Sequence, residues 1–403
     1  MSGKISGTIA SMAHPENLKA SEVASIAFVL ICCFAASLGM AFNIDGIKES
    51  FDLTNADAGE LISLEMFSIA VGNFFFARLT HITNSKKVFF IGASIILLFN
   101  LLSVLATEPL HLAFFRIPTG LALGAVAATC AGRIARSDKP DINFGVVNSA
   151  VGLMGVFMAF TLPRALNLDF SVSNYFNLTG IDGLYLVYGL CALFALLVVY
   201  RTPDDNEKKS QAKNKSTKVL RIGWLALFGI GIMFFGHATV GLFIVRIGRE
   251  IGLSPEHIGY VFMVGSSLGI ALPLIAGWIG TKLRAFSPIL ILVTLLAMAT
   301  GVLSTSDSAW QYFLVVPIFA TLPTAIMPIF LGCLARTDGS GKLAASHVAF
   351  VLLGTSAAPF IGGILIDKGG FGLAGGFSVF MIMLGTLLIT PMVLNADQQK
   401  MLS

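Results

Sequence analysis

The sequence has 403 residues, of which 56% are hydrophobic and 12% are charged, and its formal net charge is +4. Soluble domains carry about 25% charged residues, so this chain has too few charges to cover a water-facing surface. The composition therefore excludes an ordinary soluble protein, and the small net charge gives no indication of a nucleic-acid partner.

The apolar residues are gathered in twelve runs along the chain, and each run is long enough to cross a bilayer. Spanning about 30 Å of hydrocarbon takes roughly 20 apolar residues in a helix. Runs of this length and uniformity favour helices over barrel strands, which alternate in polarity. We therefore predict an all-α integral membrane protein with twelve transmembrane helices. The runs lie near 23–43, 58–79, 88–106, 110–131, 143–163, 182–200, 222–244, 256–279, 286–305, 310–332, 344–366 and 372–394.

Polar segments divide the chain between and around these runs. Residues 1–22 form a leader without a small-residue cleavage site at its end, so we expect the first run to be retained as a span. The stretch "RTPDDNEKKSQAKNKSTKVLR" (201–221) separates a bundle of six helices over 23–200 from a second bundle over 222–394. A tail, 395–403, follows.

The distribution of Lys and Arg predicts the orientation of the spans. Twenty of these residues fall in segments on the side of the N-terminus, and five fall on the other side: Lys48, Arg164, Arg246, Arg249 and Lys368. Because cytoplasmic loops carry the excess of positive charge, we expect both termini in the cytoplasm. The localisation expected is a cell membrane, and specifically a bacterial inner membrane.

Two short phrases occur twice at an offset of 200 residues. "GRIARSD" (132–138) matches "GCLARTD" (332–338), and "DLTNADAG" (52–59) faces "GLSPEHIG" (252–259). In the second pair, a hydroxyl residue stands where an N-cap would open a helix. Six spans is an even number, so both halves enter the membrane in the same direction and form a parallel repeat about an axis along the membrane normal.

These features make the sequence similar to the major facilitator superfamily of transporters. The basic end of the loop phrase after the second span is present as Lys86 and Lys87, and "RIPTG" resembles the span-four phrase with Arg116, Thr119 and Gly120. The resemblance implies two pseudo-symmetric six-helix bundles, alternating access, a small-molecule substrate, no cofactor and a monomer. His81 stands at the family's acidic loop position, and the Gly-Pro phrase of span five in drug/proton antiporters is absent.

The phrases at 132–138 and 332–338 resemble the cytoplasmic exits of spans four and ten. They are either an inside gate latch, in which Asp pairs with basic loops, or solvated loops that set topology. The candidate gating residues are Arg136, Asp138, Arg336, Asp338, Lys86 and Lys87.

Ionisable residues within a span are costly and are usually paired or functional. Glu65 and Arg116 lie at matching depth, roughly 10 Å below the outer boundary at 1.5 Å per residue. We predict that they form a pair lining the cavity, where Arg116 receives a substrate carboxylate and Glu65 carries a proton. The alternative is a structural salt bridge between two spans.

Three further polar side chains are candidates for substrate or proton binding. His237 lies in the seventh apolar run, where it is either a proton or substrate site or a packed histidine. Asn73 and Asn148 lie in spans two and five, where each contacts either substrate or a neighbouring helix. The glycines of "GTSAAPFIGG" (354–363) either bend span eleven or let it pack closely.

No catalytic motif is present, and the five cysteines have no metal-ligand spacing, so we expect neither an enzyme nor a metal protein. Energy then comes from an ion gradient. The function expected is secondary active transport of a small organic molecule, favouring proton-coupled uptake of an organic or aromatic anion. The alternatives are proton-driven efflux of a lipophilic compound, a membrane sensor without transport, and, least of all, an intramembrane enzyme.

Overall fold

The computed structural model describes residues 17–79, 82–137, 139–167, 169–173, 176–204, 221–338 and 342–402. These residues are almost entirely helical. The helices are α1 (Ala20–Cys33), α2 (Ala35–Leu38), α3 (Met40–Phe51), α4 (Asn55–Leu79), α5 (Ser85–Ser103), α6 (Pro109–Ala135), α7 (Pro140–Leu166), α8 (Ile181–Val199), α9 (Arg221–Gly241), α10 (Ile244–Glu250), α11 (Pro255–Lys282), α12 (Phe286–Ser304), α13 (Ala309–Thr337) and α14 (Lys342–Leu402).

Each predicted apolar run coincides with helix, although helices and runs do not correspond one to one. The first run is broken at Phe34 and Gly39 into α1, α2 and α3, and the seventh is divided between α9 and α10. The last two runs lie in α14, which is interrupted at Gly369 and Gly370. Within the described residues, nine helical stretches are long and apolar enough to cross a membrane.

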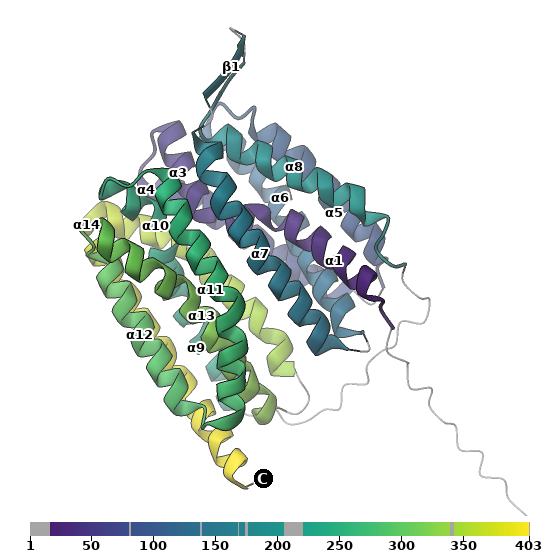
Figure 1. Cartoon of the computed structure of the whole chain (residues 1–403), viewed down its shortest axis with the longest axis vertical. Coiled ribbons are helices and arrows are strands. Elements are labelled where there is room, and N and C mark those ends of the chain that lie inside the picture. The colour runs from purple at the N-terminus through teal and green to yellow at the C-terminus, as the bar shows by residue number, and fades with distance from the viewer. Residues whose placement is uncertain are drawn as a thin grey trace, which may run out of the picture.

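The helices form two bundles side by side, one from α1–α8 and one from α9–α14 (Figure 1). A small hairpin projects at one end of the molecule, and the C-terminus of α14 lies at the other. We call these the hairpin end and the tail end. Helices α4, α6, α11 and α13 begin at the hairpin end, and α5, α7 and α12 begin at the tail end.

The hairpin was not expected from the sequence. Strands β1 (Asp169–Ser173) and β2 (Phe176–Thr179) pair antiparallel between α7 and α8, with Asp169 opposite Thr179. The all-α prediction is correct for the bundles but missed this short pair, because a two-stranded hairpin lies outside the apolar runs from which the prediction was made.

The hydroxyl residues of the second repeated phrase cap equivalent helices, as predicted. The Thr54 hydroxyl accepts a hydrogen bond from Asp57 N at 3.1 Å before α4, and the Ser254 hydroxyl accepts from His257 N at 3.4 Å before α11. Each side chain satisfies a backbone N–H that has no partner within its helix. The repeat therefore starts spans two and eight by the same device.

The expected tail is part of the folded structure. Helix α14 continues to Leu402, and the Asp397 carboxylate accepts hydrogen bonds from Ala285 N at 2.7 Å and Phe286 N at 2.9 Å. An anion at a helix N-terminus is favourable, so Asp397 joins the end of α14 to the start of α12. Residues 395–402 of the expected tail are therefore a helical continuation of the last span.

Glycines set the close approach of helices within each bundle. A Cβ on Gly124 of α6 would lie 2.2 Å from Ile69 O of α4, and one on Gly354 of α14 would lie 2.2 Å from Gly231 O of α9. Small residues let backbones approach closely in membrane proteins. Of the two interpretations of the "GTSAAPFIGG" glycines, close packing is the one that the structure supports at Gly354.

Candidate functional site

An interbundle cavity of about 520 Å³ lies between the two bundles. Its walls come from Leu38 of α2 and from α7, α11 and α13. Most of the lining side chains are apolar. The polar groups on its wall are Asn148, Ser266, Thr321 and Thr324. The lining residues lie in the middle of these helices and toward the tail end.

A cluster of charged side chains joins the two bundles at the hairpin end. The Asp45 carboxylate of α3 is fully buried, with Arg249 Nε at 2.6 Å and Arg246 Nη1 at 3.3 Å, both from α10. Arg246 also pairs with Glu49, one turn along α3. Because a buried carboxylate is costly without nearby cations, the two arginines stabilise the packing of α10 against α3.

Asp367 of α14 makes a second connection between the bundles. Its carboxylate accepts hydrogen bonds from Asn55 N at 3.2 Å, Asn55 Nδ2 at 2.7 Å and Ala56 N at 2.8 Å. The first backbone N–H groups of α4 are therefore capped by a carboxylate from the other bundle. A Cβ on Gly363 would lie 2.2 Å from Asn55 O, so the two backbones also touch here.

Helices α7 and α11 make the third connection at the hairpin end. Arg164 Nη2 donates to the Tyr260 hydroxyl at 3.3 Å, and Asn167 Nδ2 donates to the Glu256 carboxylate. A Cβ on Gly259 would lie 2.4 Å from Ala159 O. Together the three connections close the interbundle cavity at the hairpin end in this conformation.

Glu65 and Arg116 form the predicted ion pair, but they do not line the interbundle cavity. Arg116 Nη1 lies 3.6 Å from Glu65 Oε1, and their side chains are 1% and 0% exposed. Arg116 Nη2 donates to Asn100 Oδ1 and to the Thr119 hydroxyl, both at 3.0 Å. Its guanidinium stacks over the Tyr185 ring at 4.8 Å. The pair therefore lies inside the N-terminal bundle, between α4, α5, α6 and α8.

This buried polar group is incompletely satisfied. Among described residues, neither carboxylate oxygen of Glu65 has a hydrogen-bond partner, and the same holds for Arg116 Nε and the Tyr185 hydroxyl. Buried polar atoms are nearly always hydrogen-bonded, so these exceptions require a specific explanation, of which a catalytic or proton-carrying role is one. The geometry permits a proton to be added to Glu65 without breaking any hydrogen bond of its side chain.

The three other candidates lie in different surroundings. Asn148 lines the interbundle cavity. His237 packs its ring 4.3 Å from the Phe319 ring, and its buried Nδ1 has no hydrogen-bond partner among described residues. Asn73 lies where α4 crosses α6, with its backbone N 2.5 Å from the position of a Cβ on Gly124. Asn148 is thus the amide best placed to meet substrate in this conformation.

Three of the candidate gating residues at the tail end make contacts of their own among the described residues. Lys86 Nζ lies 3.3 Å from Asp204 Oδ1, and Lys87 N donates to Asn84 at the start of α5. The Asp338 carboxylate accepts from Leu343 N at 3.0 Å and so connects α13 to α14. The expected pairing of Asp338 with a basic loop stays a prediction.

The two arginines of the repeated phrase lie at the ends of different helices, α6 and α13. Arg336 Nη2 contacts Cys333 Sγ at 3.4 Å within its own helix. Arg136 is the C-cap of α6, and two of its guanidinium nitrogens are buried without a hydrogen-bond partner among described residues. Asp138 lies outside the described residues. The inside latch stays a prediction.

The sequence reasoning missed Asp45 and Asp367. Asp45 lies just past the end of the first predicted span, and Asp367 just past the eleventh, so neither was treated as an intramembrane charge. A signal was available for Asp45, because Arg246 follows it by 201 residues, close to the repeat offset. Near-equivalent positions in two pseudo-symmetric halves meet at the symmetry axis.

Two helical bundles, each built from six apolar segments, surround a cavity that is closed at one end. This architecture is that of a membrane transporter rather than an enzyme. Within the described part of the chain, no group of three or more His, Cys, Asp or Glu could hold a metal ion. A family profile described as the Major Facilitator Superfamily matches residues 24–337. The chain belongs to this superfamily, and it is a multi-pass membrane protein.

Individual relatives agree with this assignment. A gallate transporter of Pseudomonas putida is 28% identical over 150 residues, which are 34% of this chain and 33% of that protein. A bacterial homologue of the human lysosomal transporter Spinster, inward-facing and unoccupied, has a TM-score of 0.71 at 13% identity, covering 95% of this chain and 98% of its own. A D-xylose–proton symporter has a TM-score of 0.69 at 12% identity, covering 91% and 96%. At these identities, the two solved structures show the fold.

Proposed function

We propose that the protein takes up a small organic acid, preferably an aromatic one, together with protons across a bacterial inner membrane. The tail end then faces the cytoplasm, with both termini, and the hairpin end faces outward. The observation that carries the proposal is the interbundle cavity, where amide and hydroxyl groups are placed in apolar walls between two separable bundles.

The size and chemistry of the cavity suit such a substrate. Its 520 Å³ falls within the roughly 300–1,000 Å³ typical of small-molecule sites. Phe262 and aliphatic side chains offer contact to a ring, and Asn148, Ser266, Thr321 and Thr324 offer hydrogen bonds to hydroxyl and carboxyl groups. The similarity of one third of the chain to a gallate transporter supports an aromatic acid.

We assign proton coupling to Glu65 and a positioning role to Arg116. Because Arg116 is held by Asn100 and Thr119 and covers the Tyr185 ring, it keeps its place when Glu65 is neutral. Protonation of Glu65 removes its electrostatic attraction to Arg116, which holds α4 and α6 together, and release of the proton restores that attraction. Our first expectation, that Arg116 receives the substrate carboxylate, requires a guanidinium that reaches the cavity, and here that guanidinium is enclosed.

Alternating access then consists of opening the hairpin end and closing the tail end. Opening the hairpin end separates Asp45 from Arg246 and Arg249, and it removes Asp367 from the start of α4. The hairpin end therefore opens when substrate and proton make the other arrangement of the bundles at least as favourable.

The test is uptake into proteoliposomes with a panel of aromatic and aliphatic acids. We expect Glu65→Gln to abolish accumulation driven by a proton gradient while exchange of labelled for unlabelled substrate continues, because exchange needs no net proton movement. Asn148→Ala should weaken apparent substrate affinity about 5- to 50-fold, the cost of one to two hydrogen bonds. Asp307→Asn, a carboxylate on the exposed surface, is the matched control and should behave as wild type.

Three outcomes would overturn the proposal in whole or in part. If Glu65→Gln retains full gradient-driven accumulation, the ion pair is a structural salt bridge. If no acid is transported but a lipophilic compound leaves the vesicles against its gradient, the protein is an efflux transporter. Transport of nothing on the panel in either direction, with folded protein, would favour the sensor alternative.

A further inference from the structure

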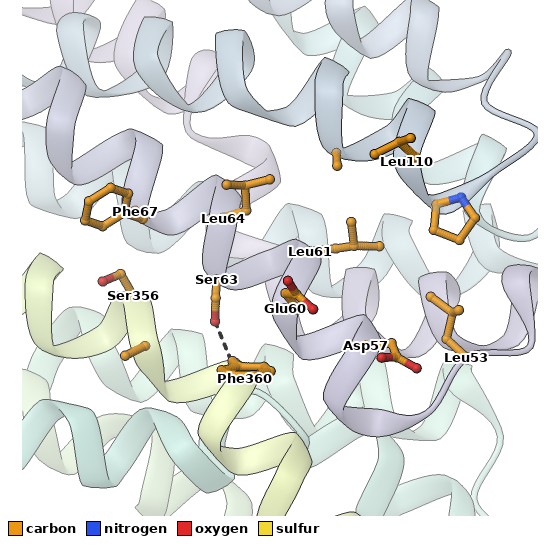
Figure 2. A pocket seen from close by; sticks show the side chains of 13 residues that line it. Leu53, Asp57, Glu60, Leu61, Ser63, Leu64, Phe67, Leu110, Ser356 and Phe360 are labelled. Atoms are coloured by element: carbon orange, nitrogen blue, oxygen red, sulfur yellow. Dashed lines mark hydrogen bonds between the residues drawn. The ribbon is translucent and has the colours of Figure 1, made fainter.

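A second hollow lies on the flank of the molecule at the hairpin end, outside the interbundle cavity. We call it the flank groove; its volume is about 640 Å³, and Figure 2 shows the side chains that line it. Leu61, Leu64 and Phe67 come from α4, Leu110 comes from α6, and Phe360 comes from α14. The groove thus has walls from both bundles.

The walls of the flank groove are apolar and exposed. Leu110 is 62% exposed, Phe67 51% and Phe360 37%. In a multi-pass membrane protein, side chains of this kind at this place meet lipid. From Asp57 to Phe67 the groove follows α4 for about 15 Å, at 1.5 Å per residue. That is half of the roughly 30 Å hydrocarbon thickness, so the groove matches the chain of a lipid in one leaflet.

The mouth of the flank groove is acidic. The carboxylates of Asp57 and Glu60, in the first two turns of α4, are exposed and line the groove (Figure 2). The Thr54 hydroxyl donates to Asp57 at 2.7 Å, whereas Glu60 makes no hydrogen bond or ion pair with another described residue. Leu53, beside Asp57 in Figure 2, also lines the groove, and Lys48 Nζ donates to the Leu53 carbonyl oxygen at 2.8 Å.

This arrangement of charge and apolar surface specifies one kind of occupant. An ammonium carries three donors and a positive charge, which two carboxylates accept, and Lys48 supplies a cation for a neighbouring phosphate. A quaternary ammonium has no N–H to donate. We propose that the flank groove binds a phospholipid with a primary-ammonium head group, held at Asp57 and Glu60 with its acyl chain along Leu64 and Phe67.

The occupant favours one conformation of the transporter. Ser63 of α4 accepts a hydrogen bond from Phe360 N of α14 at 3.0 Å, so the floor of the groove is itself an interbundle contact. When the hairpin end opens, the α14 wall leaves the α4 and α6 walls. A lipid that contacts all three helices binds the closed form better and shifts the population toward it.

The experiment measures which lipids stay with the full-length protein. The protein is reconstituted in nanodiscs of equal phosphatidylethanolamine and phosphatidylcholine, extracted in mild detergent, and its retained lipids are quantified by mass spectrometry. We expect phosphatidylethanolamine to be enriched about two- to fivefold, the range of a partly exposed ion pair. Glu60→Gln should bring the ratio close to one. Glu250→Gln, an exposed carboxylate away from the groove, should leave it unchanged.

A second variant tests the apolar part of the site. Ala357→Trp places a large side chain in the groove and should reduce the retention of both lipids. Equal retention of the two lipids by wild type would overturn the proposal. So would enrichment of phosphatidylglycerol when it replaces phosphatidylcholine, which would indicate an anion site. A ratio that Glu60→Gln leaves unchanged, together with an amount of retained lipid that Ala357→Trp does not reduce, would place the lipid elsewhere. Because the readout is bound lipid, a failure here is independent of which substrate is transported.

Discussion

Asp367 offers the most direct test of how the hairpin end is held closed. Its carboxylate accepts three hydrogen bonds from the first two residues of α4, although it belongs to the other bundle. An N-cap side chain contributes about 0.5–2 kcal/mol to the helix it caps. Asp367 is exposed, so water and salt reduce its effect, and we take about 1 kcal/mol.

The consequence falls on a conformational equilibrium rather than on folding, because the contact exists only while the bundles meet. A loss of about 1 kcal/mol multiplies the ratio of open to closed hairpin ends by about five. Asp367→Ala should have this effect. Asp367→Asn keeps an acceptor oxygen but loses the charge, so its ratio of open to closed hairpin ends should lie between those of Asp367→Ala and wild type.

Spin labels at the hairpin end measure this ratio. Position 108, at the start of α6, and position 310, at the start of α13, belong to different bundles, and Trp310 is 75% exposed. Double electron–electron resonance between labels at these two positions gives the fraction of molecules with the longer distance. The five native cysteines are all buried, which limits labelling elsewhere.

The matched control is Lys368→Ala, which changes the next residue, also exposed, without touching the contact to α4. A distance distribution that Asp367→Ala leaves unchanged in folded protein would refute the reasoning. The same shift in Lys368→Ala would also refute it, because the effect would then come from the bend of α14 and not from the cap.

Two further predictions concern the same end of the molecule. Arg249→Ala leaves the buried Asp45 carboxylate with Arg246 as its remaining arginine partner, and since Arg249 is 32% exposed we expect the free energy of unfolding to fall by about 1–2 kcal/mol. Adding Asp45→Asn to this variant should restore part of the lost stability. Fully additive losses in the double variant would show that Asp45 and Arg249 do not stabilise one another. Gly363→Ala would place a Cβ 2.2 Å from Asn55 O, a backbone atom that cannot move aside, so we expect a larger open fraction in the same distance measurement. Gly376→Ala, with no atom within 4 Å of its Cβ, should have no effect, and equal behaviour of the two variants would contradict the packing argument.

The sequence by itself determined that lipid surrounds most of the chain, where the helices lie, and that the two halves repeat. A charged fraction of 12% requires lipid around most of the chain, and apolar runs of span length must be helices because lipid offers no partner for backbone groups. The N-caps at Thr54 and Ser254 and the pairing of Glu65 with Arg116 also followed from local rules: a free helix N-terminus needs an acceptor, and a charge in a span needs a partner at its depth.

Only the tertiary structure decided which way each side chain faces and what lies across from it. Depth along a span is set by residue number, but rotation about the helix axis is set by packing, so Arg116 points into its own bundle and Asn148 into the cavity. Asp367 caps a helix that begins 312 residues earlier, and the flank groove needs α4, α6 and α14 together. Contacts of that sequence separation depend on how two bundles meet, and local periodicity carries no information about that meeting.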